Sequence, residues 1–335
     1  MKKTFFFFSV GLCIFFAGFS IANLIKKPTS NENLAKIIPI AKPLESYTID
    51  NLSNGINSGE FTKGKVLSQE KNYTSYLFDF RFSPNLKSEQ SKTTTGMINI
   101  PEGQGPFPLV LLLRGYVDQK SYQTGAGSKN VGYYLAENGF ITLAPDFLGY
   151  AGSDSESDNI FESRFQTYVT AVSLLNSIGQ IENWDGKNIF IWGHSNGGQI
   201  ALTVLEISQR NIPTVLWAPV SKPFPYSILY YTDESDDHGR LIRSELAKFE
   251  QIYDVEKYSL TNYFGNIDKN IKIQIHQGTS DQSVPRDWTD TLVKNLDNQD
   301  VQVEYFLYPG ADHNLRPSWN TAVERTLVFF RRELI

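Results

Sequence analysis

Apolar residues recur with two different spacings along this chain, and the spacing changes near residue 101. Between residues 65 and 100 apolar and polar residues alternate, which is typical of antiparallel strands. From residue 109 onward short apolar runs alternate with segments of helical spacing, which indicates a mostly parallel sheet with helices on both faces. The expected strands are 65–68, 73–82, 95–100, 109–113, 141–144, 188–192, 214–218, 271–276 and 301–308, and the expected helices are 131–138, 161–178, 199–207, 241–253 and a final amphipathic one.

A different pattern stands at the N-terminus, where residues 4–25 are uncharged and lie between Lys2-Lys3 and Lys26-Lys27. As a helix this run would be about 33 Å long, enough to cross the apolar part of a bilayer. Two interpretations stay open: a retained membrane anchor, which the length favours, or a signal peptide cut after Ser20-Ile21-Ala22. Both place the remaining chain outside the cytoplasm, anchored to a membrane in the first case and secreted in the second.

The chain therefore divides into three parts. Residues 1–27 form the anchor or signal segment, and 61–335 form one α/β domain. Residues 28–60 are assigned to a tether, which is polar from Pro28 to Lys42 and is expected to form a short helix or turn at Tyr47–Asn57. No seven-fold repeat of short strands precedes the parallel region, and about 70 residues are too few for a β-propeller.

The most informative segment follows the apolar run Ile189–Trp192 and reads Gly193-His194-Ser195-Asn196-Gly197. A strand that ends at Gly-x-Ser-x-Gly and continues as a helix is typical of the nucleophile elbow of α/β-hydrolases. The serine there occupies a strained turn, and glycines flank it because neighbouring backbone comes too close for a side chain. The alternative is a chance match in an ordinary turn. The strand before the motif and the helix after it favour the elbow, with Ser195 as nucleophile.

An elbow requires an acid and then a histidine later in the chain. Of the four histidines, His313 follows the strand 301–308 and a turn, and precedes the final helix, where a general base is expected. His194 lies inside the elbow and is expected to be structural. His238 lies in an acidic loop, and His276 ends a strand too early to be the base. We therefore predict that His313 is the base.

The acid is expected in the loop after the strand 271–276, where Asp281 stands. Its carboxylate would accept a hydrogen bond from Nδ1 of His313 and stabilise the imidazolium that forms when Ser195 loses its proton. Asp312, beside the histidine, and Asp146, after an earlier strand, fit the chain order less well. A plain turn aspartate is the structural alternative for Asp281.

Five motifs now stand in one order, and from about Tyr47 to Leu334 the chain resembles the prolyl-oligopeptidase-like (S9-type) and dienelactone-hydrolase-like α/β-hydrolases. The motifs are Leu111-Leu112-Leu113-Arg114-Gly115-Tyr116, residues 144–154, Trp192–Gly198, His276–Pro285 and Tyr308–Asn314. The resemblance implies an α/β-hydrolase fold and a Ser-Asp-His triad. It says little about the substrate, since such proteins include peptidases, esterases and unassigned hydrolases.

The resemblance also locates the oxyanion hole, in the backbone amide of Asn196 and in Tyr116, through its amide or its phenol. The family commonly carries His-Gly before this second donor, whereas this chain has Arg114-Gly115. Arg114 either fills the place of the histidine structurally, which we favour, or extends into the cleft and binds an anionic substrate group.

An insertion at residues 220–268 follows the strand 214–218 and is long enough to form a lid. It contains Phe224, Tyr226, Tyr230 and Tyr231. These rings either line the substrate pocket, with Tyr226 and Tyr230 as binding residues, or pack against one another.

Composition removes several classes of function. The chain has 335 residues, 31 of them Lys or Arg and 36 Asp or Glu, for a net charge of −5. No basic stripe suggests nucleic acid as a partner. Cys13 is the single cysteine, so no disulfide forms within the chain. No metal-ligand spacing or phosphate-binding loop is recognisable, and we expect chemistry without a cofactor.

The sequence thus predicts a serine hydrolase of the S9-like peptidase class that acts on a small ester or a short peptide. A carboxylesterase of small esters is an alternative, because ester and amide hydrolysis pass through the same tetrahedral intermediate. A second alternative is a catalytically silent, membrane-tethered protein that binds a ligand in the inherited cleft.

Overall fold

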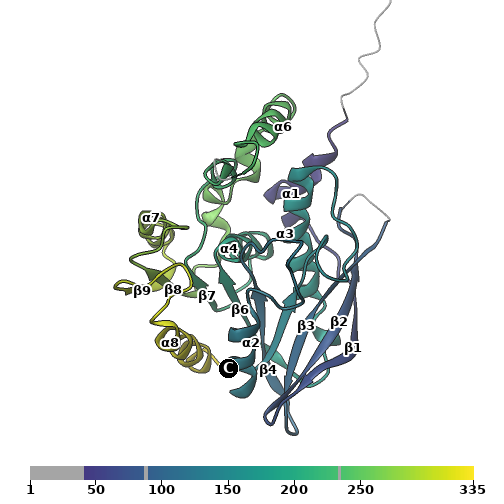
Figure 1. Cartoon of the computed structure of the whole chain (residues 1–335), viewed down its shortest axis with the longest axis vertical. Coiled ribbons are helices and arrows are strands. Elements are labelled where there is room, and N and C mark those ends of the chain that lie inside the picture. Colours follow the sequence, from purple (N-terminus) through teal and green to yellow (C-terminus); the bar gives the residue numbers. More distant parts are fainter. Residues whose placement is uncertain (1–40, 87–89, 233–234) are drawn as a thin grey trace, which may run out of the picture. The chain divides into compact units, whose positions relative to one another are not determined.

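The computed structural model describes residues 41–86, 90–232 and 235–335 and contains one central sheet. Its strands are β1 (Glu60–Gln69), β2 (Tyr73–Phe82), β3 (Lys92–Pro101), β4 (Phe107–Leu113), β5 (Ile141–Pro145), β6 (Trp184–His194), β7 (Thr214–Trp217), β8 (Lys272–Gly278) and β9 (Gln302–Tyr308). Their order in the sheet is β1-β2-β3-β5-β4-β6-β7-β8-β9 (Figure 1). Strands β1 to β3 pair antiparallel, β3 joins β5 antiparallel, and the remaining neighbours are parallel. The predicted change of sheet type is confirmed.

Helices cover both faces of this sheet. They are α1 (Ile49–Ser53), α2 (Lys129–Glu137), α3 (Ile160–Asn176), α4 (Asn196–Ser208), α5 (Tyr226–Leu229), α6 (Arg240–Glu250), α7 (Arg286–Asp297) and α8 (Trp319–Arg332). Short 3-10 turns lie at η1 (Pro43–Tyr47), η2 (Ile178–Gln180), η4 (Val255–Tyr258), η5 (Leu260–Asn262) and η6 (Phe264–Asn266).

The central strand β4 shows how the two layers form, because successive side chains of a strand point to opposite faces. Leu109, Leu111 and Leu113 join the cluster that contains the apolar residues of α3 and α4. Val110 and Leu112 join the other cluster, with residues of α2 and α8. All five side chains are buried. The apolar run 109–113 therefore reads as continuous, since the strand is covered on both faces.

The second half of the predicted tether belongs to the domain, and the short helix expected at Tyr47–Asn57 is α1 (Ile49–Ser53). Residues from Lys42 onward belong to the same compact unit as the sheet. Leu44 and Tyr47 are buried, and the Tyr47 hydroxyl donates a hydrogen bond to the carbonyl of Pro84 at 2.9 Å. Apolar residues in this segment pack against the domain, so the domain begins near Lys42 rather than at residue 61. The expected anchor at 1–27 and the tether up to residue 40 lie outside the described residues.

No helix in the described part of the chain is both long and apolar enough to span a membrane.

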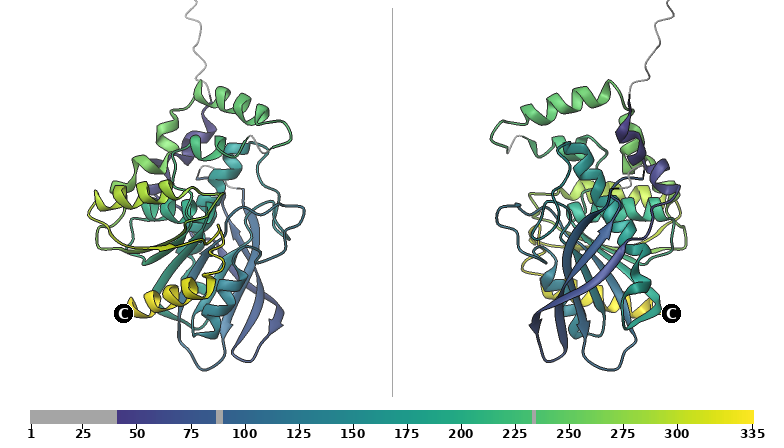
Figure 2. Two further views of the ribbon diagram at one scale, coloured as in Figure 1. Left: turned by 60° about the vertical axis from the view of Figure 1, so that its left-hand side comes forward. Right: turned by 90° about the vertical axis from the view of Figure 1, so that its right-hand side faces the viewer.

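The expected insertion occupies the chain between β7 and β8 and carries α5, α6 and η4 to η6. In both views of Figure 2 the helix α6 lies beyond the ends of the strands. The base of the insertion is anchored by an aromatic cluster on α3. Ring centroids are 5.6 Å apart for Phe224 and Phe161, 5.1 Å for Phe249 and Phe161, and 4.9 Å for Tyr258 and Phe165. Such pairs contribute about 0.5–1.5 kcal/mol each beyond their buried area.

One buried carboxyl in α4, that of Glu206, has no hydrogen-bond partner among the described residues. Burial raises its pKa well above the usual value, so it is protonated in the folded protein over a wide pH range. The folded state then binds one proton more than the unfolded state at any pH between the two pKa values. Stability must therefore fall as pH rises through this window, by about 1.4 kcal/mol for each pH unit.

We predict that Glu206→Gln removes this loss, because a neutral amide of similar shape needs no proton. The free energy of unfolding, measured with urea from pH 5 to pH 8, should decline less steeply in the variant than in the wild type. Glu250→Gln, an exposed change on α6, is the matched control. Parallel stability curves for wild type and Glu206→Gln would contradict an uncharged Glu206.

Candidate active site

Ser195 lies at the sharp turn between β6 and α4, as the motif predicts. Its backbone is strained, with φ of 57° and ψ of −122°. The flanking glycines are required by close approach: a Cβ at Gly197 would lie 1.9 Å from the carbonyl oxygen of Leu113, and one at Gly193 would lie 2.6 Å from that of Gly197. The backbone amide of Ser195 donates a hydrogen bond to the carbonyl oxygen of Trp217 at 2.9 Å. The strand–turn–helix arrangement is confirmed, and the serine is held above the sheet edge.

His313 and Asp281 meet beside this turn, although 32 residues separate them. Nδ1 of His313 lies 2.9 Å from Oδ2 of Asp281, whose side chain is fully inaccessible to solvent. The carboxylate also accepts hydrogen bonds from the amides of Ser283 and Val284, both at 2.9 Å. Burial by itself would raise the pKa of Asp281, but the hydrogen bonds from His313 and from the two amides outweigh it and hold the pKa below its usual value. A carboxylate anion therefore faces Nδ1 and leaves Nε2 of His313 available to Ser195.

The alternative acids are engaged elsewhere. Asp146 accepts hydrogen bonds from the hydroxyls of Tyr122 at 2.7 Å and Thr95 at 2.6 Å. Asp312 accepts the amides of Asn314 and Arg316, both at 2.9 Å. Each carboxylate thus orders a turn or loop, and neither contacts the imidazole of His313.

The other histidines are also placed. His276 is buried between Tyr308 and Gln274, with both contacts at 2.7 Å, and burial lowers its pKa to about 3. His238 is exposed just before α6. Neither approaches Ser195, as expected.

His194 has a role that sequence reasoning missed. Its Nε2 lies 3.0 Å from the carbonyl oxygen of His313, and the two imidazole centroids are 4.7 Å apart. Burial and the nearby His313 lower the pKa of His194 to about 4. The ring is therefore neutral near pH 7 and donates its Nε2 proton to that carbonyl. His194, the residue before the nucleophile, thereby positions the backbone of His313, the predicted base. The only sequence signal for this role is the position of His194 directly before Ser195 in the motif.

The two predicted oxyanion donors both lie at Ser195. The loop after β4 passes close to the serine. A Cβ on Gly115 would lie only 2.9 Å from the Cβ of Ser195 and 3.4 Å from its Oγ. Tyr116 and Asn196 both line the cavity that contains Ser195 and His313. Within the described residues neither backbone amide donates to a protein acceptor, so both are available to a substrate oxygen. The Tyr116 ring is largely exposed.

Arg114 has the structural role that we favoured, and it does not extend into the main cavity as the alternative required. Its Nη1 donates to the carbonyl of Gly115 at 3.0 Å and its Nη2 to that of Asp146 at 2.8 Å. The guanidinium lies 4.0 Å from the ring centroid of Tyr150 and 4.6 Å from that of Tyr122. Buried and occupied in this way, Arg114 holds the loop that presents Tyr116.

The cavity over Ser195 has a volume of about 760 Å³. Tyr226 and Tyr230 do not line it. They pack on each other, with centroids 6.1 Å apart, and on Trp288, with centroids 6.0 and 4.7 Å away, which is the second of the two interpretations given above. The insertion contributes Ser227, Ile228 and Tyr231 instead. The full lining is Gly115, Tyr116, Val117, Gly127, Arg164, His194, Ser195, Asn196, Val220, Ser227, Ile228, Tyr231, Ser235, Ser283, His313 and Asn314.

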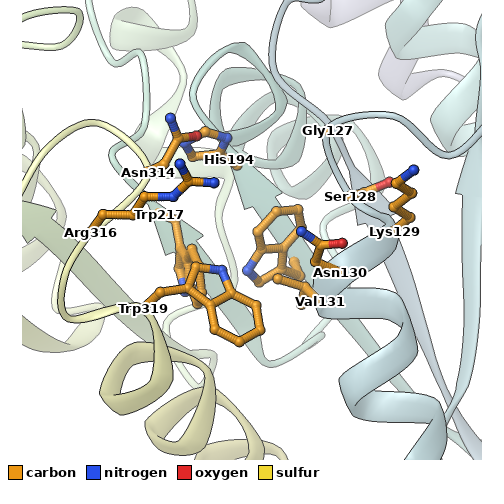
Figure 3. A pocket seen from close by; sticks show the side chains of 11 residues that line it. Gly127, Ser128, Lys129, Asn130, Val131, His194, Trp217, Asn314, Arg316 and Trp319 are labelled. Atoms are coloured by element: carbon orange, nitrogen blue, oxygen red, sulfur yellow. The ribbon is translucent and has the colours of Figure 1, made fainter. Parts of the chain in front are cut away.

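A smaller cavity of about 160 Å³ adjoins the first and shares Gly127, His194 and Asn314 with it. Figure 3 shows Trp217, Trp319 and Arg316 on one side and Lys129 and Asn130 of α2 on the other. The indole of Trp192, which also lines this cavity, lies 6.1 Å from the His194 imidazole, centroid to centroid. Among the described residues no group of three or more His, Cys, Asp or Glu side chains is arranged to hold a metal ion.

Comparison with known proteins agrees with this geometry. Residues 128–334 match the Prolyl oligopeptidase family, Peptidase_S9. The chain is 25% identical over 164 residues to the acetyl esterase Axe7A of Xylanibacter ruminicola, across 41% of this chain and 35% of that protein. The chain thus spans about a third of that relative's length.

Solved structures are similar as well, among them the following two. The acetyl xylan esterase from Paenibacillus sp. R4 has a TM-score of 0.61 and 17% identity, over 84% of this chain and 91% of that one. A puromycin-hydrolyzing peptidase of Mycobacterium tuberculosis has a TM-score of 0.53 and 16% identity, over 82% of this chain and 39% of that one. These likenesses show the α/β-hydrolase fold, and the predicted fold class is confirmed.

Proposed function

Because the chain belongs to the prolyl oligopeptidase family, as its motifs predicted, we propose that it hydrolyses ester or amide bonds through an acyl-enzyme on Ser195. The observation that carries the proposal is the 2.9 Å contact between Asp281 and Nδ1 of His313, in a site whose cavity also exposes Ser195 at its strained turn. Acid, base and nucleophile come from three separate loops. If the turn at Ser195 were only structural, the fold would have no need to place the buried Asp281 carboxylate against the imidazole of His313, which faces the cavity.

The first half of the reaction transfers the acyl group. Ser195 Oγ attacks the carbonyl carbon while Nε2 of His313 takes its proton, and Asp281 stabilises the imidazolium through Nδ1. The amides of Asn196 and Tyr116 donate to the oxygen that becomes negative, where one lost donor typically costs about 100–1000-fold in kcat. His313 then returns the proton to the leaving group.

The second half repeats these steps with water. His313 deprotonates the water, which attacks the acyl carbon, and Ser195 recovers its proton as the acid leaves. His194 keeps the base in place throughout, through its hydrogen bond to the His313 carbonyl.

We favour small esters over peptides with a free amino terminus. Of the described residues that line the main cavity, the only one with a permanent charge is Arg164, a cation. A protonated amino group would be repelled by it. In the described part of the chain before β4, strands β1 to β3 extend the main sheet rather than form a separate sieve over the cavity.

The experiment that tests the proposal is labelling of the full-length protein with a fluorophosphonate, followed by peptide mapping. We expect covalent modification at Ser195, together with turnover of 4-nitrophenyl esters that exceeds turnover of aminoacyl amides. A folded protein that neither reacts with the probe nor hydrolyses any substrate would support the catalytically silent binding protein instead.

We also propose that residues 4–25 anchor the enzyme in a membrane with its catalytic domain outside the cytoplasm. The uncharged run with lysines on both flanks supports this. Membrane fractionation with N-terminal sequencing of the mature protein tests it. A mature N-terminus at residue 23 in the soluble fraction would show that the segment is a cleaved signal peptide.

A further inference from the structure

The main cavity contains a cation that the proposed mechanism does not use. Arg164 lies in the second turn of α3, 31 positions before Ser195, and lines the same cavity as Ser195 and His313. It also lines a side pocket of about 210 Å³ that shares Tyr116 and Asn196 with the main cavity. Arg164 therefore stands on the oxyanion side of the catalytic serine.

Local structure holds Arg164 at this place. The Asn159 side chain accepts hydrogen bonds from the amides of Phe161 and Glu162 at 3.0 and 3.1 Å, which fixes the start of α3. Nη2 of Arg164 donates to Oε1 of Gln199 at 2.5 Å. Gln199 is buried in α4 one turn after Ser195, so the guanidinium is tied to the helix that begins at the nucleophile.

The rest of the guanidinium has no protein partner among the described residues. Nε of Arg164 is buried without a partner, and Nη1 has no acceptor among the described residues. In that part of the chain no carboxylate lies within 4 Å of Arg164. Within the described residues Arg114 shares the unpartnered Nε, but both of its terminal nitrogens donate to carbonyl oxygens, whereas only one of the terminal nitrogens of Arg164 has a protein acceptor. A partly buried cation is costly unless it is paired, so the structure leaves a place for an anion.

We propose that Arg164 binds a carboxylate of the substrate, so that the preferred substrates are esters or amides with a free carboxylate near the scissile carbonyl. This inference rests on the proposed hydrolase function. The main cavity is the place for the anion, because its described lining contains no acidic residue. The side pocket contains Glu156, whose carboxylate is held by Gln119 and Ser163 and would repel it.

The test uses matched pairs of substrates that differ only in charge. Mono-4-nitrophenyl glutarate and 4-nitrophenyl pentanoate place or omit a carboxylate on the acyl side. The acetyl esters of 4-hydroxybenzoate and 4-hydroxybenzamide do so on the leaving-group side. For the full-length enzyme, kcat/KM is measured for each member of a pair, and the ratio of anionic to neutral substrate is the readout.

Arg164→Gln should lower this ratio by about 10- to 100-fold in at least one pair, because it removes a charge-assisted hydrogen bond. Arg164→Lys should restore part of it, since the charge is retained. Arg210→Gln removes one exposed positive charge after α4 and should leave the ratio at the wild-type value. High salt should lower the wild-type ratio as well. A purely structural role of Arg164 would lower kcat/KM for both members of a pair equally.

The inference and the proposed function fail in different ways. Turnover of neutral esters with an anionic-to-neutral ratio that Arg164→Gln leaves unchanged in both pairs would overturn the carboxylate site and retain the hydrolase. If neither an ester nor an amide is turned over, the proposed function fails, and calorimetric binding of monomethyl glutarate against methyl pentanoate decides the site. Preferential binding of the anion that Arg164→Gln abolishes would support it, and equal binding by wild type and variant would overturn it.

Discussion

Ser195→Ala and His313→Ala are each expected to lower kcat by about 10⁶-fold, and the double variant should fall no further. The two residues act as one unit, since the serine is a weak nucleophile without a base and the base has no proton to accept without the serine. The oxyanion amides of Asn196 and Tyr116 remain in each variant. Residual hydrolysis about 10³–10⁴-fold above that in water should therefore persist.

The measurement is single-turnover kinetics on a 4-nitrophenyl ester, with active-site titration to exclude contaminating wild type. His238→Ala, an exposed histidine away from the cavity, is the control and should retain wild-type kcat. If the losses in the two single variants add in the double variant, the residues act independently and the proposed mechanism is wrong.

Asp281→Asn is expected to lower kcat by about 10⁴-fold while leaving KM much closer to the wild-type value. The buried carboxylate holds a proton on Nδ1 of His313, at 2.9 Å, and stabilises the imidazolium. An asparagine amide that donates to Nδ1 would place the imidazole proton on Nε2, where the base must instead be free. Asp281 is not part of the described cavity lining, so substrate binding should change little.

The pH dependence of stability gives an independent readout for Asp281. Its pKa in the folded protein lies below the usual value, so its stabilising contribution is present above the unfolded-state pKa and is lost as pH falls through the folded-state pKa. Asp281→Asn should therefore lower the free energy of unfolding at pH 7, with a smaller difference near pH 3. Asp312→Asn is the matched control beside the same histidine. A larger loss of kcat in Asp312→Asn than in Asp281→Asn would reassign the acid.

Local patterns were sufficient for the order and type of the strands. The parallel strands are buried on both faces and read as apolar runs, so most of them were recognisable, although β6 starts at Trp184 rather than at residue 188. The helix α7 was not predicted. Its buried positions Trp288, Leu292 and Leu296 are spaced by four among charged residues, a narrow stripe that stands out only once β8 and β9 are in place.

The sequence did not predict the contacts of residues whose neighbours come from distant segments of the chain. The sequence left open whether Tyr226 and Tyr230 line the pocket or pack on one another, and Trp288 of α7, 58 positions after Tyr230, completes the packed arrangement. Arg164 drew no attention within a helix read as core, because Gln199 and the cavity wall that make it functional lie over 30 positions away.

By itself, therefore, the sequence determined the elbow, the chain order of Ser195, Asp281 and His313, and the alternation that builds the sheet. These depend on glycine sterics, turn position and side-chain periodicity, which are local properties. Only the tertiary structure decided that Arg114 is occupied by carbonyl oxygens, that His194 holds the base, and that Arg164 is left without an anion beside the nucleophile. Hydrogen-bond satisfaction and burial depend on what the rest of the chain brings to each group, and no spacing along the sequence contains that information.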